Sequence, residues 1–238
     1  MRPAFYSLAS GRRRDYVSLL HVPYTLWHLS YVAIGACLAP ELRWSLLGWT
    51  IVAFALALGI AAHALDELRG RPLGTRIASW ALGALAVGSL AAASAIGIAV
   101  AVDTTLWLLA FVAAGAFLVL AYNLELVGGL FHTDLWFGLA WGGFPVLTAY
   151  FAQAERLRWE ALLAAVFAVL LSLAQRRLST PVRLVRRRVT AVSGTIELSD
   201  GTREPVTAAL LIAAPERALQ ALTAATVTLA ATLIVLRL

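Results

Sequence analysis

Long apolar runs, separated mostly by short polar links, make up most of the 238-residue chain. The runs cover roughly residues 17–39, 45–66, 77–101, 104–124, 133–152, 159–175 and 217–236. About 20 apolar residues in a helix cross the hydrocarbon core of a bilayer, where only helices and closed barrels satisfy their backbone hydrogen bonds. The alternation typical of a barrel strand is absent from these runs. The pattern predicts an all-α integral membrane protein, with one transmembrane domain over residues 1–238 built as a single bundle of about seven helices.

The composition agrees with this class. Hydrophobic residues make up 61% of the chain and charged residues 13%, and the mean hydropathy is +0.82. Soluble domains are about 45–50% apolar and about 25% charged. Cys37 is the single cysteine, which excludes an intramolecular disulfide and a cysteine-based metal cluster. We therefore expect a multi-pass protein of the cell membrane.

The basic residues are unevenly distributed between the links. All 19 are arginines, and 15 of them lie before residue 17, between 66 and 76, or between 176 and 217. The other four are Arg43, Arg156, Arg158 and Arg237. The positive-inside rule places the arginine-rich links and the N-terminus in the cytoplasm. The net charge of +6 is then a topology and lipid-headgroup signal, because nucleic-acid binding would need a soluble basic domain, which the sequence lacks.

The long link 176–216 contains two kinds of sequence. Its first part, up to residue 189, mixes arginines with a few apolar residues and predicts a surface segment on anionic lipid. Further on, Ile196 and Leu198 alternate with polar residues and a turn signal follows at 200–201, which predicts a small cytoplasmic β-hairpin within 190–205. This hairpin would be a lid over the bundle or a surface for a protein partner. The stretch 208–214 is too short to span and predicts a re-entrant or interfacial piece.

Charged residues cluster at the inner end of the second apolar run. Asp66 and Glu67 are hard oxygen ligands, which suit a Mg²⁺ ion that bridges a diphosphate. Arg69 and Arg71 follow closely, and their guanidinium groups could grip phosphate oxygens in a forked geometry. The same four residues are also what an exposed, self-neutralising loop would contain.

The link between the fourth and fifth runs is acidic. It holds Tyr122, Asn123, Glu125, His132 and Asp134 and no arginine, which is unusual for an inside loop. An acidic loop beside basic ones suits a site in which the acids hold a metal ion and the arginines bind the phosphates. Glu125 and Asp134 are therefore further candidate metal ligands. The alternative is that Asp134 begins a helix, where a carboxylate favours the N-terminus.

Histidines in the first run are a third group of candidates. His21 and His28 are seven residues apart and so share a helix face. Ionisable residues inside membrane helices are functional candidates by default, and a pair of histidines can ligate haem, here His28 with His63 or His132. A histidine that is hydrogen-bonded to a neighbouring helix would look the same in the sequence.

Several segments resemble the UbiA-type membrane polyprenyltransferases. The stretch PYTLWHL at 23–29, followed by IGA at 34–36, resembles the first helix of that family. RPLGTRI at 71–77 resembles the exit from its first aspartate-rich loop, and GGFPVLTAY at 142–150 is similar to a helix of the menaquinone-type members. These matches cover roughly residues 17–155. The resemblance implies a UbiA-like bundle that binds an isoprenoid diphosphate through Mg²⁺ held by two acidic motifs.

The chain departs from the family pattern at both acidic motifs. With Asp66 and Glu67 aligned on the first motif, Gly70 and Gly74 stand where later aspartates belong. The second motif should follow the sixth helix, where this chain reads RRLST at 176–180. The chain also has fewer predicted helices than family members usually have.

Two functional hypotheses follow. The first is a divergent prenyltransferase that acts on an isoprenoid lipid at the cytoplasmic face. Its assigned residues are Asp66, Glu67, Glu125 and Asp134 as metal ligands, Arg69, Arg71, His28 and Trp27 as binding residues, and Asp66, Glu67, Tyr122 and Asn123 as catalytic residues. The second is a non-catalytic lipid-binding or assembly protein that kept the bundle and lost the metal motifs, with 190–205 as a partner surface. A haem-binding cytochrome is a third hypothesis, and absorbance near the Soret band would decide it.

Cysteine labelling tests the predicted orientation. An Asp200→Cys variant, made in a Cys37→Ser background, should react with a membrane-impermeant maleimide only after the cells are opened, because the arginine-rich links are predicted to be cytoplasmic. A Glu41→Cys variant on the opposite side serves as the control and should react in sealed cells. Labelling of the Asp200→Cys variant in sealed cells would reverse the orientation.

Overall fold

The computed structural model describes residues 2–8 and 11–238 and is mostly helical. Its helical elements are α1 (Arg12–Leu19), α2 (Val22–Leu38), α3 (Trp44–Phe54), η1 (Ala55–Ala62), α4 (His63–Gly70), α5 (Ser79–Asp103), α6 (Leu108–Asn123), α7 (Leu126–Gly129), α8 (Asp134–Phe137), η2 (Gly138–Gly143), α9 (Phe144–Ala154), α10 (Trp159–Arg188) and α11 (Ala208–Val235). The segments η1 and η2 are π-helical turns within the continuous helices Trp44–Gly70 and Asp134–Ala154. The strands are β1 (Thr195–Glu197) and β2 (Arg203–Pro205).

Five helices within 2–8 and 11–238 are long and apolar enough to cross a membrane. They are Trp44–Gly70, Ser79–Asp103, Asp134–Ala154, Trp159–Arg188 and Ala208–Val235. Every predicted span overlaps helical structure, and the first one overlaps the end of α1 as well as α2. Helices α2 and α6 have only 17 and 16 residues, which makes them shorter than the other five. The predicted class, a helical bundle with the character of a membrane protein, is confirmed. The number of seven spans and the orientation stay predictions.

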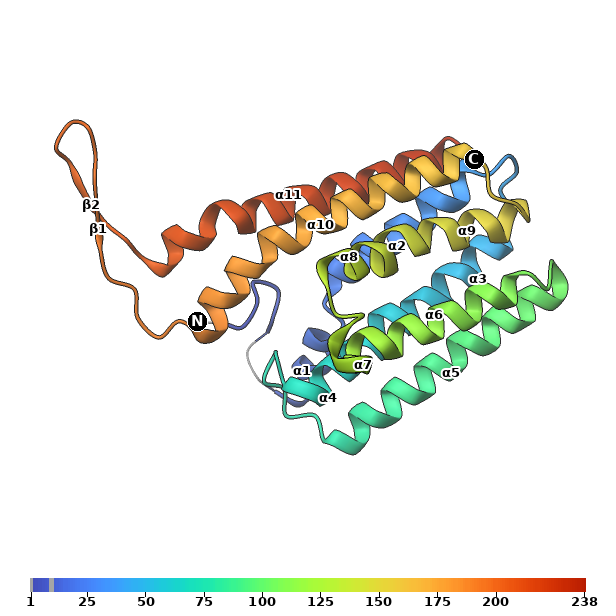
Figure 1. The fold of residues 1–238 in the computed structure, drawn as a ribbon, viewed down its shortest axis with the longest axis horizontal. Coiled ribbons are helices and arrows are strands. Elements are labelled where there is room, and N and C mark those ends of the chain that lie inside the picture. The colour runs from blue at the N-terminus through green and yellow to red at the C-terminus, as the bar shows by residue number, and fades with distance from the viewer. Residues whose placement is uncertain (1, 9–10) are drawn as a thin grey trace.

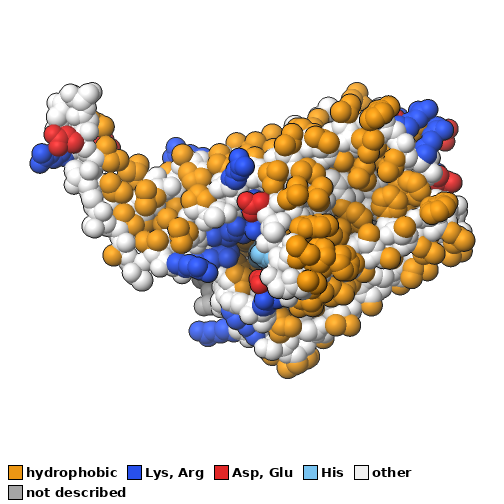
Figure 2. All heavy atoms as spheres, in the orientation of Figure 1, with side chains coloured by type: hydrophobic (Ala, Val, Ile, Leu, Met, Phe, Trp, Pro, Cys, Tyr) orange, Lys and Arg blue, Asp and Glu red, His pale blue; other side chains and the backbone are white. Residues whose placement is uncertain are grey.

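The flank of the bundle exposes large apolar side chains. Trp80, Trp107 and Trp159 are 79%, 77% and 78% exposed, which is unusual for a surface that faces water. Figure 2 shows apolar side chains over the sides of the helices and charged side chains gathered toward the ends. Tryptophans near the ends of membrane helices typically lie at the lipid headgroups. This surface therefore suits a lipid environment.

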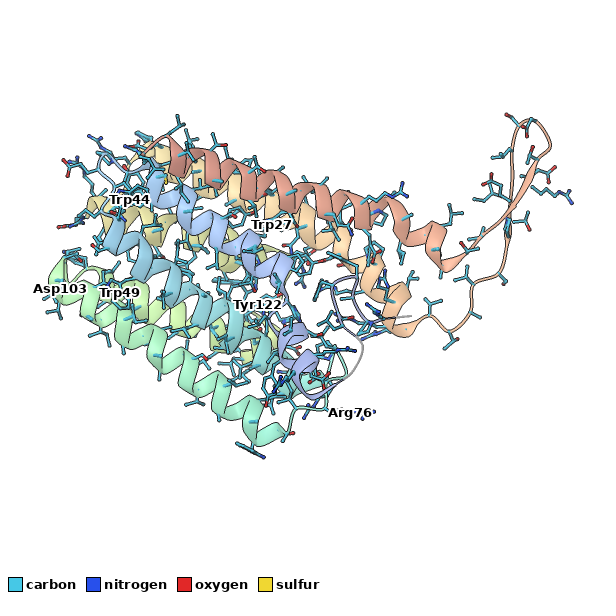
Figure 3. The ribbon with its side chains drawn as sticks, turned by 180° about the vertical axis from the view of Figure 1, so that it is seen from behind. Trp27, Trp44, Trp49, Arg76, Asp103 and Tyr122 are labelled. Carbon is cyan, nitrogen blue, oxygen red and sulfur yellow. The ribbon has the colours of Figure 1, made fainter. Side chains whose placement is uncertain are left out.

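The helices form two groups that meet along α2, α3 and α9. In Figure 1, α10 and α11 lie along one side of the molecule and α5 and α6 along the other. Helix α2 packs against both α9 and α11, and α5 packs against α3, η1 and α6. Figure 3 shows Trp44 and Asp103 at one end of the bundle and Arg76 at the other. We call the end that carries Arg76 the arginine-rich end.

The sequence-based boundaries of the last two helices were wrong. The segment 176–189, predicted as a surface stretch on lipid, continues α10 through Pro181 to Arg188. The segment 208–214, predicted as a re-entrant or interfacial piece, is the first part of α11. The link between the two helices therefore shrinks to residues 189–207.

Helices α10 and α11 extend beyond the apolar bundle because they pair with each other. Val182 and Val185 of α10 bury against Ile212 of α11. Beside this contact, Arg186 forms an ion pair with Glu216 in which Nη2 lies 2.8 Å from Oε2, and both side chains are only 14% exposed. Each helix thus supplies the partner surface that the other needs outside the bundle.

The predicted β-hairpin is present. Strands β1 and β2 pair antiparallel with Ile196 opposite Glu204. The turn holds Gly201 at a φ of +83°, and the carboxylate of Asp200 accepts the N–H of Thr202 at 2.8 Å. All residues from 193 to 205 are exposed, and Figure 1 shows the hairpin projecting away from the helices. In this arrangement it does not cover the bundle, and its role as a partner surface stays a prediction.

Two helix crossings depend on glycine. A Cβ atom on Gly35 of α2 would lie 2.3 Å from the carbonyl oxygen of Val146 in α9. A Cβ atom on Gly142 of η2 would lie 2.5 Å from the carbonyl oxygen of Ala168 in α10. The backbones therefore touch at both crossings, as small residues allow in membrane bundles.

Alanine at either crossing should destabilise the fold. We expect Gly35→Ala and Gly142→Ala to lower the free energy of unfolding by about 1–3 kcal/mol, the usual cost of overpacking. Gly83→Ala and Gly88→Ala are the controls, because nothing lies within 4 Å of a Cβ at these positions. Thermal unfolding in detergent measures the difference. Equal melting temperatures for all four variants would contradict the close crossings.

Candidate functional site

A polar cavity of about 540 Å³ lies at the arginine-rich end. All four histidines of the chain line it, together with two acids and five arginines. These residues are His21, His28, His63, His132, Asp66, Glu125, Arg69, Arg176, Arg183, Arg187 and Arg188. Figure 2 looks onto its rim, where a histidine shows between arginine and acidic side chains. The cavity therefore collects most of the chemistry that the sequence offers.

Glu67, a predicted metal ligand, holds a loop instead of facing the cavity. Its side chain is 1% exposed, and its two carboxylate oxygens accept the N–H groups of Leu73 at 3.0 Å and Thr75 at 2.7 Å. Asp15 acts similarly on the same loop and accepts the N–H of Arg76 at 2.9 Å. These carboxylates satisfy backbone donors that would otherwise be buried without partners.

Arg71 belongs to the same loop. It ends α4 in a left-handed conformation, with a φ of +48°. Its guanidinium donates to the carbonyl of Ile77 at 2.6 Å and to the hydroxyl of Ser79 at 2.9 Å. Arg71 therefore does not line the cavity, whereas Asp66 and Arg69 of the same predicted cluster do.

Arg69 connects α4 to the acidic link. It forms an ion pair with Glu125 at 2.8 Å and also donates to the carbonyl of Leu124. Asn123 lines the cavity beside them, and its amide donates to the carbonyl of Val119 at 2.7 Å. The structure thus brings the predicted residues of two separate links together.

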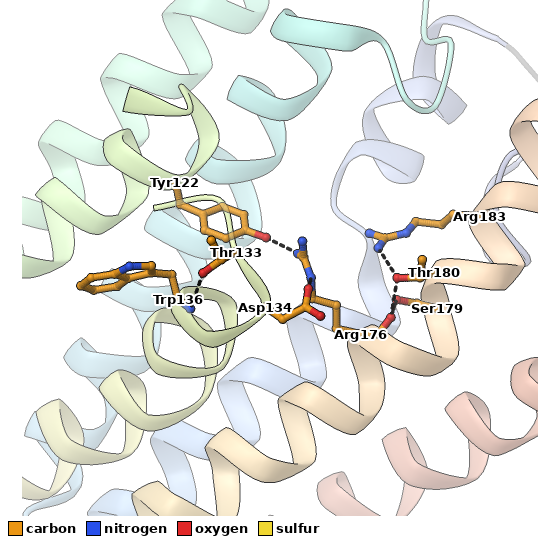
Figure 4. A network of polar contacts seen from close by, with 8 residues as sticks. All are labelled: Tyr122, Thr133, Asp134, Trp136, Arg176, Ser179, Thr180 and Arg183. Carbon is orange, nitrogen blue, oxygen red and sulfur yellow. Dashed lines mark hydrogen bonds and ion pairs between the residues drawn. The ribbon is translucent and has the colours of Figure 1, made fainter. Parts of the chain in front are cut away.

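A second network ties α10 to the same link (Figure 4). Arg176 donates to the carboxylate of Asp134 and to the hydroxyl of Tyr122. Asp134 lies in the first turn of α8, as its alternative assignment predicted, and does not line the cavity. Thr133 caps this helix by accepting the N–H of Trp136 at 3.3 Å. Tyr122 is therefore held in the cavity wall by a cation.

Three of the histidines have a defined tautomer, because each places Nδ1 against a backbone carbonyl. The pairs are His28 with Trp141 (2.9 Å), His63 with Gly59 (3.1 Å) and His132 with Tyr122 (3.0 Å). A carbonyl oxygen only accepts, so Nδ1 carries a proton in each of them, and in the neutral imidazole Nε2 then keeps a lone pair. In the neutral form these histidines can accept a hydrogen bond or a proton at Nε2.

The remaining histidine and two aromatic residues complete the mouth. His21, between α1 and α2, has a φ of +45° and stacks on His63 with ring centroids 4.0 Å apart. The ring of Tyr6 lies 5.5 Å from that of Tyr24 and 5.2 Å from that of His21. Burial raises the pKa of the Tyr6 hydroxyl, and the neighbouring Arg187 and Arg183 oppose that rise. The N-terminal segment therefore forms part of the cavity wall.

Trp27 lies away from this cavity. It is fully buried in the core between α2, α9, α10 and α11. Its indole N–H donates to the hydroxyl of Tyr31 at 2.6 Å, and Tyr31 in turn lies 3.3 Å from the hydroxyl of Ser172. The structure thus gives Trp27 a packing role and does not bring it to the other predicted binding residues.

An apolar groove of about 90 Å³ adjoins the cavity. Its walls come from α3, η1, α5, α6, η2 and α9, and they include Phe111, Phe144 and Val119. Leu58 and Trp141 line both spaces. Leu58 lies in η1 and Trp141 in η2, and π-helical turns are frequent at functional sites. The polar cavity and the apolar groove therefore share a wall that the two π-helical turns provide.

Sequence reasoning missed the contribution of α10. Arg183 and Arg187 line the cavity, and with Arg176 they recur at spacings of seven and four, which puts them on one face of a helix. Gln175 joins them, and its buried Oε1 has no hydrogen-bond partner among the described residues. The spacing of these arginines is a helical signal, but it has that meaning only if the helix continues past residue 175.

The predicted Mg²⁺ ligands are mostly engaged elsewhere. Glu67 binds backbone, Glu125 pairs with Arg69, and Asp134 pairs with Arg176. Within 2–8 and 11–238, no three His, Cys, Asp or Glu side chains are grouped to hold a metal ion. The donors present therefore do not fit the two-motif Mg²⁺ site that the resemblance implies, and Asp66 alone of the four faces the cavity without an ion pair among the described residues.

Comparisons of the chain with protein-family models, with curated proteins and with solved structures return no match. The resemblance to the UbiA-type enzymes therefore stays a prediction. What the structure defines directly is a helical protein of membrane character with a cationic cavity at one end and an apolar groove beside it.

Removal of the Glu67 charge should destabilise the protein in the absence of any ligand. Glu67→Gln leaves an amide group against a backbone N–H in a buried site, which should cost about 1–3 kcal/mol. Glu125→Gln is the control, because this half-exposed ion pair should contribute about 0–1 kcal/mol. Thermal unfolding and hydrogen exchange at Leu73 and Thr75 report the effect. If Glu67→Gln left both unchanged, the loop-anchoring role would be wrong.

Proposed function

We propose that the protein binds an isoprenoid lipid with a phosphorylated headgroup, the head in the cationic cavity and the tail in the apolar groove. The observation that carries this proposal is the wall that the two spaces share at Leu58 and Trp141. A ligand that fills both spaces must be anionic at one end and apolar at the other. Isoprenoid phosphates and diphosphates have this chemistry.

The charge of the cavity supports an anionic head. Five arginines line it against two acids, which leaves an excess of positive charge. Guanidinium groups match phosphate oxygens in geometry and in charge. Concave sites with one sign of charge attract the opposite charge from solution.

The groove supports an apolar tail. Its lining is nearly all aliphatic or aromatic, and Phe111 stacks on Phe151 next to Phe144. The groove lies between helices whose outer faces are apolar, so the part of a tail that exceeds its volume can lie in the surrounding lipid. Burial of an isoprenoid unit there is favourable by about 0.8 kcal/mol per CH₂ group.

If the protein is an enzyme, prenyl transfer is the reaction that this arrangement favours. The bond between the allylic carbon and the diphosphate oxygen would break, and a new bond would form from that carbon to a nucleophilic atom of an acceptor, whose proton passes to water. The arginines would stabilise the leaving diphosphate. Tyr122, Phe137 and Trp141 cluster at the junction with the groove, with the Tyr122 and Trp141 rings 5.3 Å apart. Aromatic faces in this position would stabilise an allylic cation.

The alternative is a lipid-binding or assembly protein without catalysis. The engagement of Glu67, Glu125 and Asp134 by other groups favours it, because the acids that would hold the metal of a prenyltransferase are occupied. In that case the exposed hairpin at 193–205 would bind a protein partner. Release of diphosphate by the purified protein with a prenyl diphosphate distinguishes the two hypotheses.

A bulky side chain in the groove should block the tail. Ser94 of α5 lines the groove, whereas the adjacent Ala95 is exposed on the outer face and does not. We expect Ser94→Phe to weaken binding of geranylgeranyl diphosphate at least about tenfold, equivalent to about 1.4 kcal/mol. Ala95→Phe, the control, should bind like the wild type. Titration calorimetry in detergent measures both.

The proposal fails if the wild type binds neither geranylgeranyl diphosphate nor its monophosphate. It also fails if Ser94→Phe and Ala95→Phe bind the lipid equally well, because the tail would then lie outside the groove.

A further inference from the structure

We infer that the cavity holds the phosphate groups of its lipid directly on arginine side chains of α10, without a divalent metal ion. This inference rests on the proposed function and specifies how its headgroup is recognised. It departs from what the family resemblance implies, since there two acidic motifs hold Mg²⁺ on the diphosphate.

The first observation is geometric. Arg176, Arg183 and Arg187 lie on one face of α10, and all three line the cavity. The pairing of α10 with α11 keeps this part of the helix formed beyond the bundle. The arginines are therefore presented from a helix rather than from a free loop, which fixes their spacing before a ligand binds.

The second observation concerns ion pairs. Arg69 and Arg176 are each paired with an acid. By contrast, Arg183, Arg187 and Arg188 have no carboxylate within ion-pair distance in the described part of the chain. Arg183 donates to the hydroxyl of Thr180 at 3.2 Å. Arg187 donates to the carbonyl of Pro3 at 3.3 Å.

The third observation is the resulting charge balance. Three guanidinium groups without acidic partners face the same cavity as one carboxylate without a cationic partner, that of Asp66. A partly buried charge without a partner is unfavourable, and an anion with several oxygens relieves this for all three arginines at once. A divalent cation at Asp66 would instead add positive charge to a site that already has an excess.

The sequence also has basic residues where the family resemblance implies acidic ones. At the place where the resemblance calls for the second acidic motif, the chain has Arg176 and Arg177. Arg176 lines the cavity, whereas Arg177 is exposed outside it. Arginine side chains would therefore supply the positive charge that neutralises the phosphate. Arg177 is a matched control, because it carries the same charge on the same helix but lies outside the cavity.

The experiment is calorimetric binding of geranylgeranyl diphosphate to the full chain in detergent, with Mg²⁺ and with EDTA. We expect the two affinities to agree within about twofold. Arg183→Gln and Arg187→Gln should each weaken binding about tenfold in EDTA, because each removes charge-assisted hydrogen bonds to the phosphates. Arg177→Gln should bind like the wild type.

Asp66→Asn separates the two mechanisms by the sign of its effect. It removes a negative charge from an anion site, so binding should be unchanged or tighter, whereas a Mg²⁺ site would lose its one free carboxylate and bind more weakly. Arg183→Lys keeps the charge and loses the fork, and its affinity should lie between those of wild type and Arg183→Gln. It also serves as the informative variant if Arg183→Gln fails to fold.

Each outcome bears on a different claim. Binding that needs Mg²⁺ and is weakened by Asp66→Asn would overturn the metal-free inference and leave the proposed lipid ligand standing. Equal effects of Arg177→Gln and Arg183→Gln would also overturn it, because the contribution would then be net charge alone. Absence of binding in both Mg²⁺ and EDTA would overturn the inference and the proposed function together.

Discussion

The pairing of α10 with α11 beyond the apolar bundle is the interaction on which the cavity depends. Burial of Val182 and Val185 against Ile212, with the Arg186–Glu216 ion pair beside them, keeps α10 helical to Arg188. A helix that ended with its apolar run would leave Arg183 and Arg187 in a loop. Because the helix continues, these arginines stand opposite α4 and the acidic link, and the end of the bundle becomes a cationic cavity.

Most of the acidic residues that the sequence offers as metal ligands instead bind backbone N–H groups and arginines. Glu67 and Asp15 are buried, and their carboxylates satisfy the backbone N–H groups of the loop that follows α4. Glu125 and Asp134 neutralise arginines from other helices. These contacts connect α4 to the start of α7 and α8 to α10. As a result, few carboxylates are left to hold a metal ion.

The sequence predicted the features that depend on local chemistry and missed those that depend on contacts between distant segments. Hydropathy located the helices, and the turn signal at Asp200 and Gly201 located the hairpin, because both depend on local chemistry. The extension of α10 was missed because its stability comes from α11, a contact that no local pattern shows. In the same way, a carboxylate that binds backbone and one that binds a metal look alike in sequence, so the role of Glu67 needed the loop that it anchors.

The central claim is that one lipid fills both the cationic cavity and the apolar groove. The most direct measurement is an experimental structure of the protein with geranylgeranyl diphosphate bound. We expect density for the diphosphate against Arg183 and Arg187, with the tail passing between Leu58 and Trp141 into the groove. Lipid density confined to the outer flank of the helices, with no ligand between α4 and α10, would contradict it.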